Sequence, residues 1–193
     1  MSALYSLGRL RALLALTFLV GCATQPQVLP ITPQLDLAGA ETRGNGRTLA
    51  LDAIDARPDN LVGLRDPADA NSAITTAEEA MRIIKRTVED GYAKLGFTIV
   101  PQGEEADITL EVRLVELGYS RQQTGVVKNV HTGATVEATS VMRGKTVTGT
   151  YRDSQGKDTV LKPNLEDNAE IMNQHLGAAL SRLIADPRLT TEN

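Results

Sequence analysis

The chain has 193 residues and carries 20 basic against 24 acidic side chains, a formal net charge of −4. This length favours one domain with appendages, and a mildly acidic chain without a basic block argues against nucleic-acid binding. With two Phe, four Tyr and no Trp, the chain has little from which to build an aromatic platform for bases or sugars.

Residues 1–21 have the three parts of an export signal. Arg9 and Arg11 form a short basic region, the run from Ala12 to Val20 is apolar, and a small-residue cleavage site follows. The apolar run is too short for a transmembrane helix, which needs about 20 residues. We therefore expect a signal peptide that is removed, which leaves 18 basic and 24 acidic side chains and a net charge of −6.

Cys22 is the only cysteine, so no disulfide can form within the chain. The motif Leu19-Val20-Gly21-Cys22 resembles the bacterial lipobox. The resemblance implies cleavage between Gly21 and Cys22 and acylation of the Cys22 thiol, so that acyl chains would hold the protein on a membrane. Ala23, rather than Asp, follows the cysteine, and by resemblance to enterobacterial sorting this favours the inner leaflet of the outer membrane, facing the periplasm. An ordinary buried cysteine or a free thiol in a secreted protein is the competing interpretation.

Residues 22–47 are predicted to form the lipidated cysteine and a flexible tether. Prolines at 26, 30 and 33 interrupt the first part, which has little hydrophobic periodicity. Glycines at 39, 44 and 46 mark the second part, where Gly44-Asn45-Gly46 is a turn signal without the lysine and hydroxyl of a phosphate-binding loop. We expect regular structure to begin at Thr48.

A strand is predicted from Thr48 to Ala56, followed by a turn and a loop over residues 60–71. From Ile74 onward, apolar residues recur every three or four positions and predict a helix of about 20 residues. Thr75 or Thr76 would cap its start, and Gly96 would end it.

Strand patterns follow this helix. Alternating apolar and polar residues from Asp107 to Leu117 predict a sheet with one buried and one solvated face. A hairpin turn is expected at Arg143-Gly144 and a further turn over residues 154–157. The other predicted strands are Phe97–Pro101, Gly125–Met142, Lys145–Tyr151 and Thr159–Leu161.

A last helix is predicted from Leu165 to Ala185, with Asn164 before it and Pro187 after it. The fold expected is α+β, with an antiparallel sheet of about four to five strands and two long helices packed on one face, in the order β-α-β-β-β-β-α. A single domain would span residues 48–187, and residues 188–193 would form a disordered tail.

The sequence resembles the YajG-like family of uncharacterised bacterial lipoproteins. The resemblance rests on the lipobox at Cys22, the proline-containing segment after it, the strand leading into Asp55-Ala56-Arg57-Pro58, the end of the first helix at Leu95-Gly96-Phe97, and the strand after Ala106-Asp107. It implies a lipoprotein of the outer membrane or periplasm with this α+β fold, and it supplies no catalytic residue.

Residues able to support catalysis or metal binding are few. The only histidines are His131 and His175, which we expect to be solvated, so a zinc site is not predicted, and no cofactor is expected. No serine lies in a Gly-x-Ser-x-Gly frame; the serines considered are Ser120, Ser140, Ser154 and Ser181.

Paired carboxylates suggest a glycosidase only superficially. Neighbouring residues on a helix do not face each other, so Glu78-Glu79 is better explained by the positive end of the helix dipole. Glu104-Glu105 follows Gly103 in a predicted turn. Asp55 and Arg57 are expected to form a structural salt link, although they could instead line a small groove.

Two functions are compatible with these patterns. The first is a non-catalytic binding or assembly module that contacts an envelope protein through an exposed sheet edge or face; the Val- and Thr-rich strands from Gly125 to Tyr151 could add a partner strand at an edge. The second is an envelope hydrolase acting on peptidoglycan or another cell-wall component, with Asp55, His131 or the paired glutamates as candidates. The sequence indicates neither the partner nor the oligomeric state.

Overall fold

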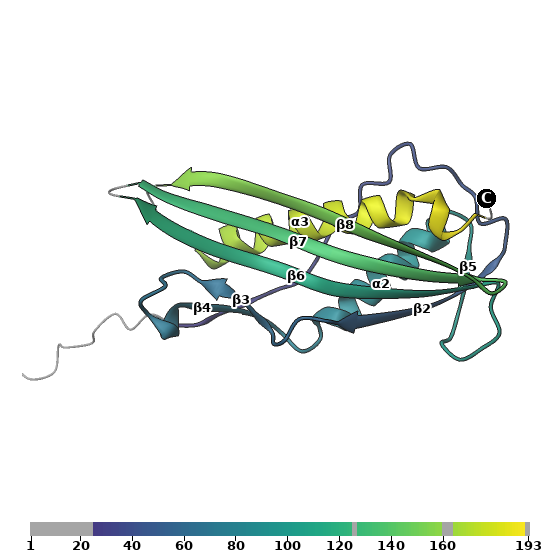
Figure 1. The fold of residues 1–193 in the computed structure, drawn as a ribbon, viewed down its shortest axis with the longest axis horizontal. Coiled ribbons are helices and arrows are strands. Elements are labelled where there is room, and N and C mark those ends of the chain that lie inside the picture. Colours follow the sequence, from purple (N-terminus) through teal and green to yellow (C-terminus); the bar gives the residue numbers. More distant parts are fainter. Residues whose placement is uncertain (1–24, 125–126, 160–163, 192–193) are drawn as a thin grey trace, which may run out of the picture.

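The computed structural model describes residues 25–124, 127–159 and 164–191. The predicted signal peptide, its cleavage site at Gly21 and Cys22, and residues 160–161 of the last predicted strand lie outside the described residues. Figure 1 shows an elongated molecule in which a long twisted sheet is covered by helices on one side. The first described residues lie at one end of the long axis and the C-terminus at the other.

Three long antiparallel strands form the body of the sheet: β6 (Ile108–Thr124), β7 (Val127–Met142) and β8 (Lys145–Thr159). Ile108, Leu110 and Val112 are fully buried on the inner face of β6, which confirms the predicted alternation. The Arg143-Gly144 hairpin is also confirmed, since both residues adopt positive φ angles of 47° and 79°.

The turn predicted over residues 154–157 is wrong. Ser154 and Lys157 lie within β8, where they pair with Gly133 and Val130 of β7. Both side chains are exposed although they lie on opposite faces of the strand, and pairing with β7 keeps this polar stretch extended.

Five shorter strands extend the sheet on the other side of β6, and the order across this part of the sheet, β6 included, is β1-β4-β3-β6-β2-β5. They are β1 (Gln27–Leu29), β2 (Thr48–Asp55), β3 (Leu61–Leu64), β4 (Ala73–Thr76) and β5 (Thr98–Val100). β2 runs parallel to both β5 and β6, and β1 runs parallel to β4.

The α+β class is therefore correct, but the sheet has eight strands and is mixed, not four to five antiparallel strands in the predicted order. The chain passes through β3, β4 and a helix between β2 and β5, and a strand that is reached through a crossover helix can run parallel to the earlier strand. Strands of three or four residues are too short to show a reliable alternation, which explains why β1, β3 and β4 were not predicted.

The first long helix, α2 (Ala80–Lys94), begins later than predicted. The Ile74-Thr75-Thr76 segment belongs to β4, and neither threonine caps the helix. β-branched residues favour extended backbone, although Ile74 happens to continue the helical stripe. Gly96 ends the helix as predicted, with a φ of 87°.

The second long helix, α3 (Leu165–Ala185), has the predicted bounds. Asn164 and Asp167 form a reciprocal capping box at its start. α3 packs against β1, β7 and β8, and α2 packs against β2 and β5. The two helices also contact each other, so they cover the same face of the sheet, as Figure 1 shows.

The prediction of a flexible tether over residues 22–47 is wrong from Gln27 onward. Leu29 and Ile31 are 0% and 3% exposed, and the segment after β1 is hydrogen-bonded along α3. The backbone N–H of Thr32 donates to the Asn173 side chain at 2.7 Å, and that of Asp36 donates to Ser181 Oγ at 2.9 Å. Residues 27–47 are therefore part of the packed fold.

The prediction of a disordered tail over residues 188–193 is wrong for residues 188–190, which are ordered and packed. Pro187–Leu189 form a short 3-10 helix, η2. Leu189 and Thr190 are both fully buried, and the Leu189 carbonyl accepts a hydrogen bond from Ser140 Oγ of β7 at 2.6 Å. The sequence after Pro187 is mostly polar, and Leu189 is its one apolar residue that packs into the core.

Candidate functional site

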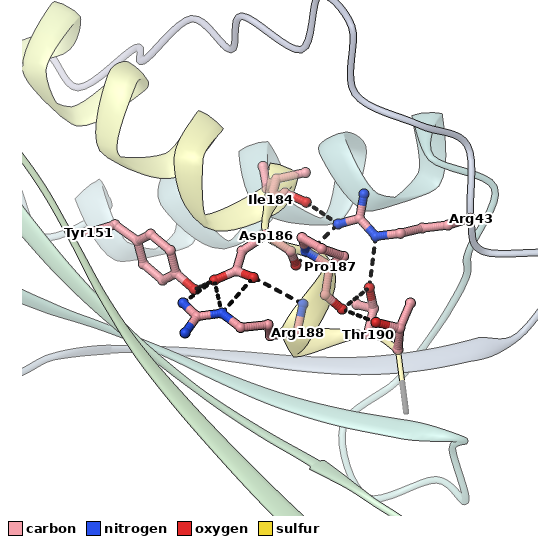
Figure 2. A network of polar contacts seen from close by, with 8 residues as sticks. Arg43, Tyr151, Ile184, Asp186, Pro187, Arg188 and Thr190 are labelled. Carbon is pink, nitrogen blue, oxygen red and sulfur yellow. Dashed lines mark hydrogen bonds and ion pairs between the residues drawn. The ribbon is translucent and has the colours of Figure 1, made fainter. Parts of the chain in front are cut away.

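A polar network joins the segment before β2 to the end of α3 and to β8 (Figure 2). The Arg43 guanidinium donates to the backbone carbonyls of Ile184 and Asp186 and, at 2.8 Å, to Thr190 Oγ1. The last carbonyls of a helix have no partner within the helix and carry partial negative charge, so an arginine there is stabilising. Arg43 therefore holds the N-terminal segment against the C-terminus.

Asp186 lies at the centre of this network. Its carboxylate accepts hydrogen bonds from Tyr151 Oη at 2.7 Å and from Arg188 Nη2 at 2.6 Å. The hydrogen bonds from Arg188 outweigh burial and lower the Asp186 pKa to about 2. Burial, followed by the bond to Asp186, raises the pKa of the Tyr151 hydroxyl. All of these contacts are within the chain, so the network is best explained as structural.

A second network connects β7, β8 and α3, and it corrects the expectation that His175 is solvated. His175 is 5% exposed. Its Nε2 lies 2.8 Å from Thr132 Oγ1, and its Nδ1 lies 2.7 Å from Asp153 Oδ2. Arg182 also binds Asp153, at 2.8 Å. Burial of Asp153 would raise its pKa, but the hydrogen bonds from His175 and Arg182 prevail and lower it.

The order hydroxyl, imidazole, carboxylate in Thr132, His175 and Asp153 is that of a nucleophilic triad. A catalytic triad must offer its hydroxyl to substrate, whereas Thr132 is 8% exposed and faces α3. The same contacts join the helix to two strands of the sheet. A structural clamp between α3 and the sheet is the role that this burial supports.

The predicted salt link between Asp55 and Arg57 is confirmed. Arg57 Nε and Nη2 donate to the two carboxylate oxygens of Asp55 at 2.9 and 2.7 Å. Nη2 also donates to Thr76 Oγ1 at 2.9 Å, and the Arg57 side chain is 4% exposed. The pair therefore fixes the turn after β2 against the end of β4, and the hydrogen bonds from Arg57 lower the pKa of Asp55.

A shallow groove of about 350 Å³ lies along the middle of the long strands, and glycines help to form its floor. Gly118 of β6 pairs with Gly133 of β7 across the sheet. Glu116 and Arg152 flank the groove and both bond to Thr135, and His131 also lines it. His131 is exposed, as expected. The charges of Glu116 and Arg152 lie 3.6 Å apart and neutralise each other.

The candidate residues of the hydrolase hypothesis are not brought together. Asp55 is bound to Arg57, and His131 lies on the long strands. Glu78-Glu79 precede α2, and Glu104-Glu105 lie in the exposed loop before β6. Within residues 25–124, 127–159 and 164–191, no group of three or more His, Cys, Asp or Glu is placed to hold a metal ion. None of the described helices is long and apolar enough to span a bilayer.

Strand β8 presents an open edge. Among the described strands it pairs with β7 alone, without a register shift over 15 residues. Arg182 donates to the Arg152 carbonyl, so this carbonyl points away from β7. Because backbone groups alternate in direction along a strand, the N–H and C=O groups of Thr146, Thr148 and Thr150 also point outward. These three threonines are exposed.

Sequence reasoning missed two of these features. His175 lies three residues after Met172 and four before Ala179, both buried, so its place on the apolar stripe of α3 was the signal for burial. Arg43 has no local signal, because its partners lie more than 140 residues away in the sequence.

Known proteins resemble this chain in sequence and in fold. The uncharacterised lipoprotein YajG of Escherichia coli K12 is 21% identical over 175 residues, which cover 90% of this chain and 85% of that protein. The crystal structure of protein XCC0632 from Xanthomonas campestris has a TM-score of 0.57 at 12% identity and covers 83% of this chain and 93% of that one. Another uncharacterised protein has a TM-score of 0.50 at 14% identity, covering 84% and 97%. These structural similarities show a shared fold.

A family profile described as "Uncharacterized lipoprotein" matches residues 33–192, which is most of the chain and nearly all of the packed fold. The resemblance to YajG-like proteins noted from short motifs is thus supported along the whole domain. The chain belongs to this family of uncharacterised lipoproteins.

Proposed function

We propose that this protein is a lipid-anchored lipoprotein of the cell envelope that binds a protein partner by adding a strand to the open edge of β8. In this proposal Cys22 carries the acyl chains, and the domain faces the periplasm from the inner leaflet of the outer membrane. Membership of a lipoprotein family supports the lipid anchor, and the lipobox-like motif supports Cys22 as the residue that carries it.

The edge of β8 that pairs with none of the described strands is the observation that carries the binding role. Soluble proteins usually protect such an edge with charges, prolines, bulges or a covering segment. The stretch from Thr146 to Tyr151 has no charged residue, no proline and no bulge. Its three exposed threonines favour extended backbone. This six-residue stretch is therefore suited to pairing with another strand.

The partner is proposed to be an extended segment of another envelope protein. Main-chain hydrogen bonds would provide affinity, and side chains pointing to the solvated face would provide specificity. On this face Thr139 of β7 and Thr148 of β8 lie side by side, with their hydroxyls 3.4 Å apart. A partner strand with small polar or β-branched residues fits beside them.

A photoreactive residue in place of Thr146 tests the proposal in cells. We expect a covalent adduct with one envelope protein, identified by mass spectrometry. The same residue in place of Arg86, an exposed position on α2, should give no such adduct. If Thr146 yields only uncrosslinked protein, or the same products as Arg86, the edge is not a binding site.

The backbone role of the edge is tested separately at Thr148. Thr148→Pro removes an outward N–H without removing a bond to β7, whereas Thr148→Ala keeps that N–H. Crosslinking from Thr146 should be lost in the proline variant and retained in the alanine variant. Equal crosslinking in both variants would contradict strand addition.

The anchor is tested by the intact mass of protein extracted from membranes. The proposed mature chain begins at Cys22 and carries added acyl mass, and Cys22→Ser should abolish both the cleavage and the added mass. A chain that is unmodified or cut elsewhere would overturn the anchor without bearing on the edge.

A hydrolase acting on peptidoglycan is the alternative, and the order of Thr132, His175 and Asp153 is the observation in its favour. Thr132→Val would remove the only hydroxyl among these three residues while keeping the side-chain volume. Release of soluble fragments from purified peptidoglycan by the wild type, and not by this variant, would support the alternative over the binding role.

A further inference from the structure

We infer that the end of the domain where β1 begins lies directly on the lipid surface that holds the anchor, with exposed apolar side chains against the headgroups. This inference rests on the proposed acylation of Cys22, and it adds a fixed orientation of the domain relative to the membrane. Its occupant is a lipid surface because the packed fold begins so soon after the proposed anchor.

Covalent geometry limits how far the domain can stand from its anchor. Gln25 is three positions after Cys22, and an extended chain spans at most about 3.6 Å per position, so their Cα atoms are at most about 11 Å apart. β1 begins two residues later, at Gln27. A free tether of 25 residues would instead reach about 90 Å. The headgroup layer itself is about 5 to 8 Å thick, so this end of the domain must meet it.

Contacts within the fold fix the position from which the chain leaves. Arg65, at the end of β3, donates to the Gln25 carbonyl, and the Arg65 carbonyl accepts from Arg121 of β6 at 2.6 Å. Gln27 is held by the side chain of Asn168, in the first turns of α3, at 2.9 Å. The exit is thus attached to the β3–β4 hairpin, to β6 and to α3, all at the same end of the molecule (Figure 1).

Exposed apolar side chains cluster around this exit. Val28 of β1 and Leu61 of β3 both pair with Thr75 of β4, so the three residues form a row on one face of the small strands. Val28 is 54% exposed and Leu61 is 42% exposed. Leu165, the first residue of α3, is 41% exposed. Half of the six large apolar side chains that are exposed in the described residues therefore lie near the exit.

The opposite end supplies a matched reference. Val141 precedes the Arg143-Gly144 hairpin and is 40% exposed on the solvated face. It resembles Val28 in size and exposure, but it lies beside the hairpin between β7 and β8, and Figure 1 shows this hairpin at the end of the molecule opposite the exit. A domain standing on its β1 end would keep Val141 away from lipid.

Tryptophan fluorescence tests the orientation, because the chain has no tryptophan of its own. Val28→Trp, Leu61→Trp and Val141→Trp would each be purified from membranes in acylated form and incorporated into vesicles. The vesicles would contain phospholipids with or without brominated acyl chains, which quench an indole only when they are close to it. We expect strong quenching and a blue shift at positions 28 and 61, and neither at position 141.

Failure of the orientation and failure of the anchor are separable. Protein that carries acyl mass and floats with vesicles, but shows equal quenching at all three positions or none at 28 and 61, would overturn the orientation alone. Protein without acyl mass that stays in solution would overturn the anchor. Val28 and Leu61 are independent probes, so one variant suffices if the other does not fold.

Discussion

Replacing Asp186 by asparagine removes the charge at the centre of the network between the two ends of the chain (Figure 2). The asparagine keeps the shape of the carboxylate and can still accept a hydrogen bond. It loses the ionic attraction to Arg188 and the charge-assisted bond from Tyr151. We expect Asp186→Asn to lower the free energy of unfolding at neutral pH.

The magnitude follows from the shift in the Asp186 pKa, from 3.8 to about 2. One pKa unit corresponds to about 1.4 kcal/mol, so the shift represents about 2 kcal/mol of stability. The Asp186 side chain is 10% exposed, but that of Arg188 is 63% exposed, and solvent screens such a pair. We therefore expect Asp186→Asn to cost about 1 kcal/mol at pH 7.

The pH dependence gives the sharper test. A carboxyl whose pKa is lower in the folded state stabilises the protein above its unfolded pKa, and the effect is lost as pH falls through its folded pKa. The difference between wild type and variant should thus be complete above about pH 5, about halved near pH 3 and nearly absent near pH 2.

Urea-induced unfolding at a series of pH values measures this difference directly. Glu104→Gln, in the exposed loop before β6, serves as a control that should show little change. A difference between wild type and Asp186→Asn that stays constant from pH 7 to pH 2 would refute the electrostatic account, and so would a variant as stable as the wild type throughout.

Two further substitutions test the contacts of α3. Gly177→Ala would place a Cβ atom 2.3 Å from the Gln34 backbone oxygen. We therefore expect the segment after β1 to detach from α3 and to become cleavable in limited proteolysis. If the variant were as resistant to protease as the wild type, this close packing would be contradicted. His175→Phe would leave the Thr132 hydroxyl without its imidazole partner, and we expect a loss of about 2 kcal/mol in urea unfolding, whereas a neutral effect would show that the clamp is dispensable.

The sequence predicted best the elements whose signals are local. The bounds of α3 follow from Asn164, the apolar stripe and Pro187, and the hairpin at Arg143-Gly144 follows from Gly144, which adopts positive φ without strain. Each of these signals lies within a few residues of the feature it specifies. Local chemistry was therefore sufficient for them.

The elements missed by sequence reasoning depend on distant partners. Prolines around β1 suggested a tether, but Thr32 and Asp36 are held by α3 residues more than 140 positions away. The polar end of β8 resembled a turn until its pairing with β7 was known. The candidate β8 edge was predicted only as part of a broad Val- and Thr-rich region, because no local pattern shows which strand lacks a neighbour.

The two proposals can be separated by lengthening the chain between anchor and domain. Thr159, the last residue of β8, pairs with Lys128 at the β1 end of the molecule. If the β1 end lies at the membrane, the first residues of β8 are therefore the part of this strand farthest from the lipid. At about 3.3 Å per residue, Thr148 lies about 36 Å beyond Thr159. Strand addition at Thr148 would therefore take place in the periplasm, away from the lipid.

Insertion of about 12 Gly and Ser residues between Thr24 and Gln25 would add a flexible linker with a mean extension of about 19 Å. We expect quenching of Leu61→Trp by brominated lipid to fall sharply, since the domain can then leave the surface. Crosslinking from Thr146 should persist, since the edge itself is unchanged. Persistent quenching would mean that Val28 and Leu61 bind lipid even without a short connection to the anchor. Loss of both quenching and crosslinking would mean that the partner reaches β8 only when the domain is held in one orientation at the membrane.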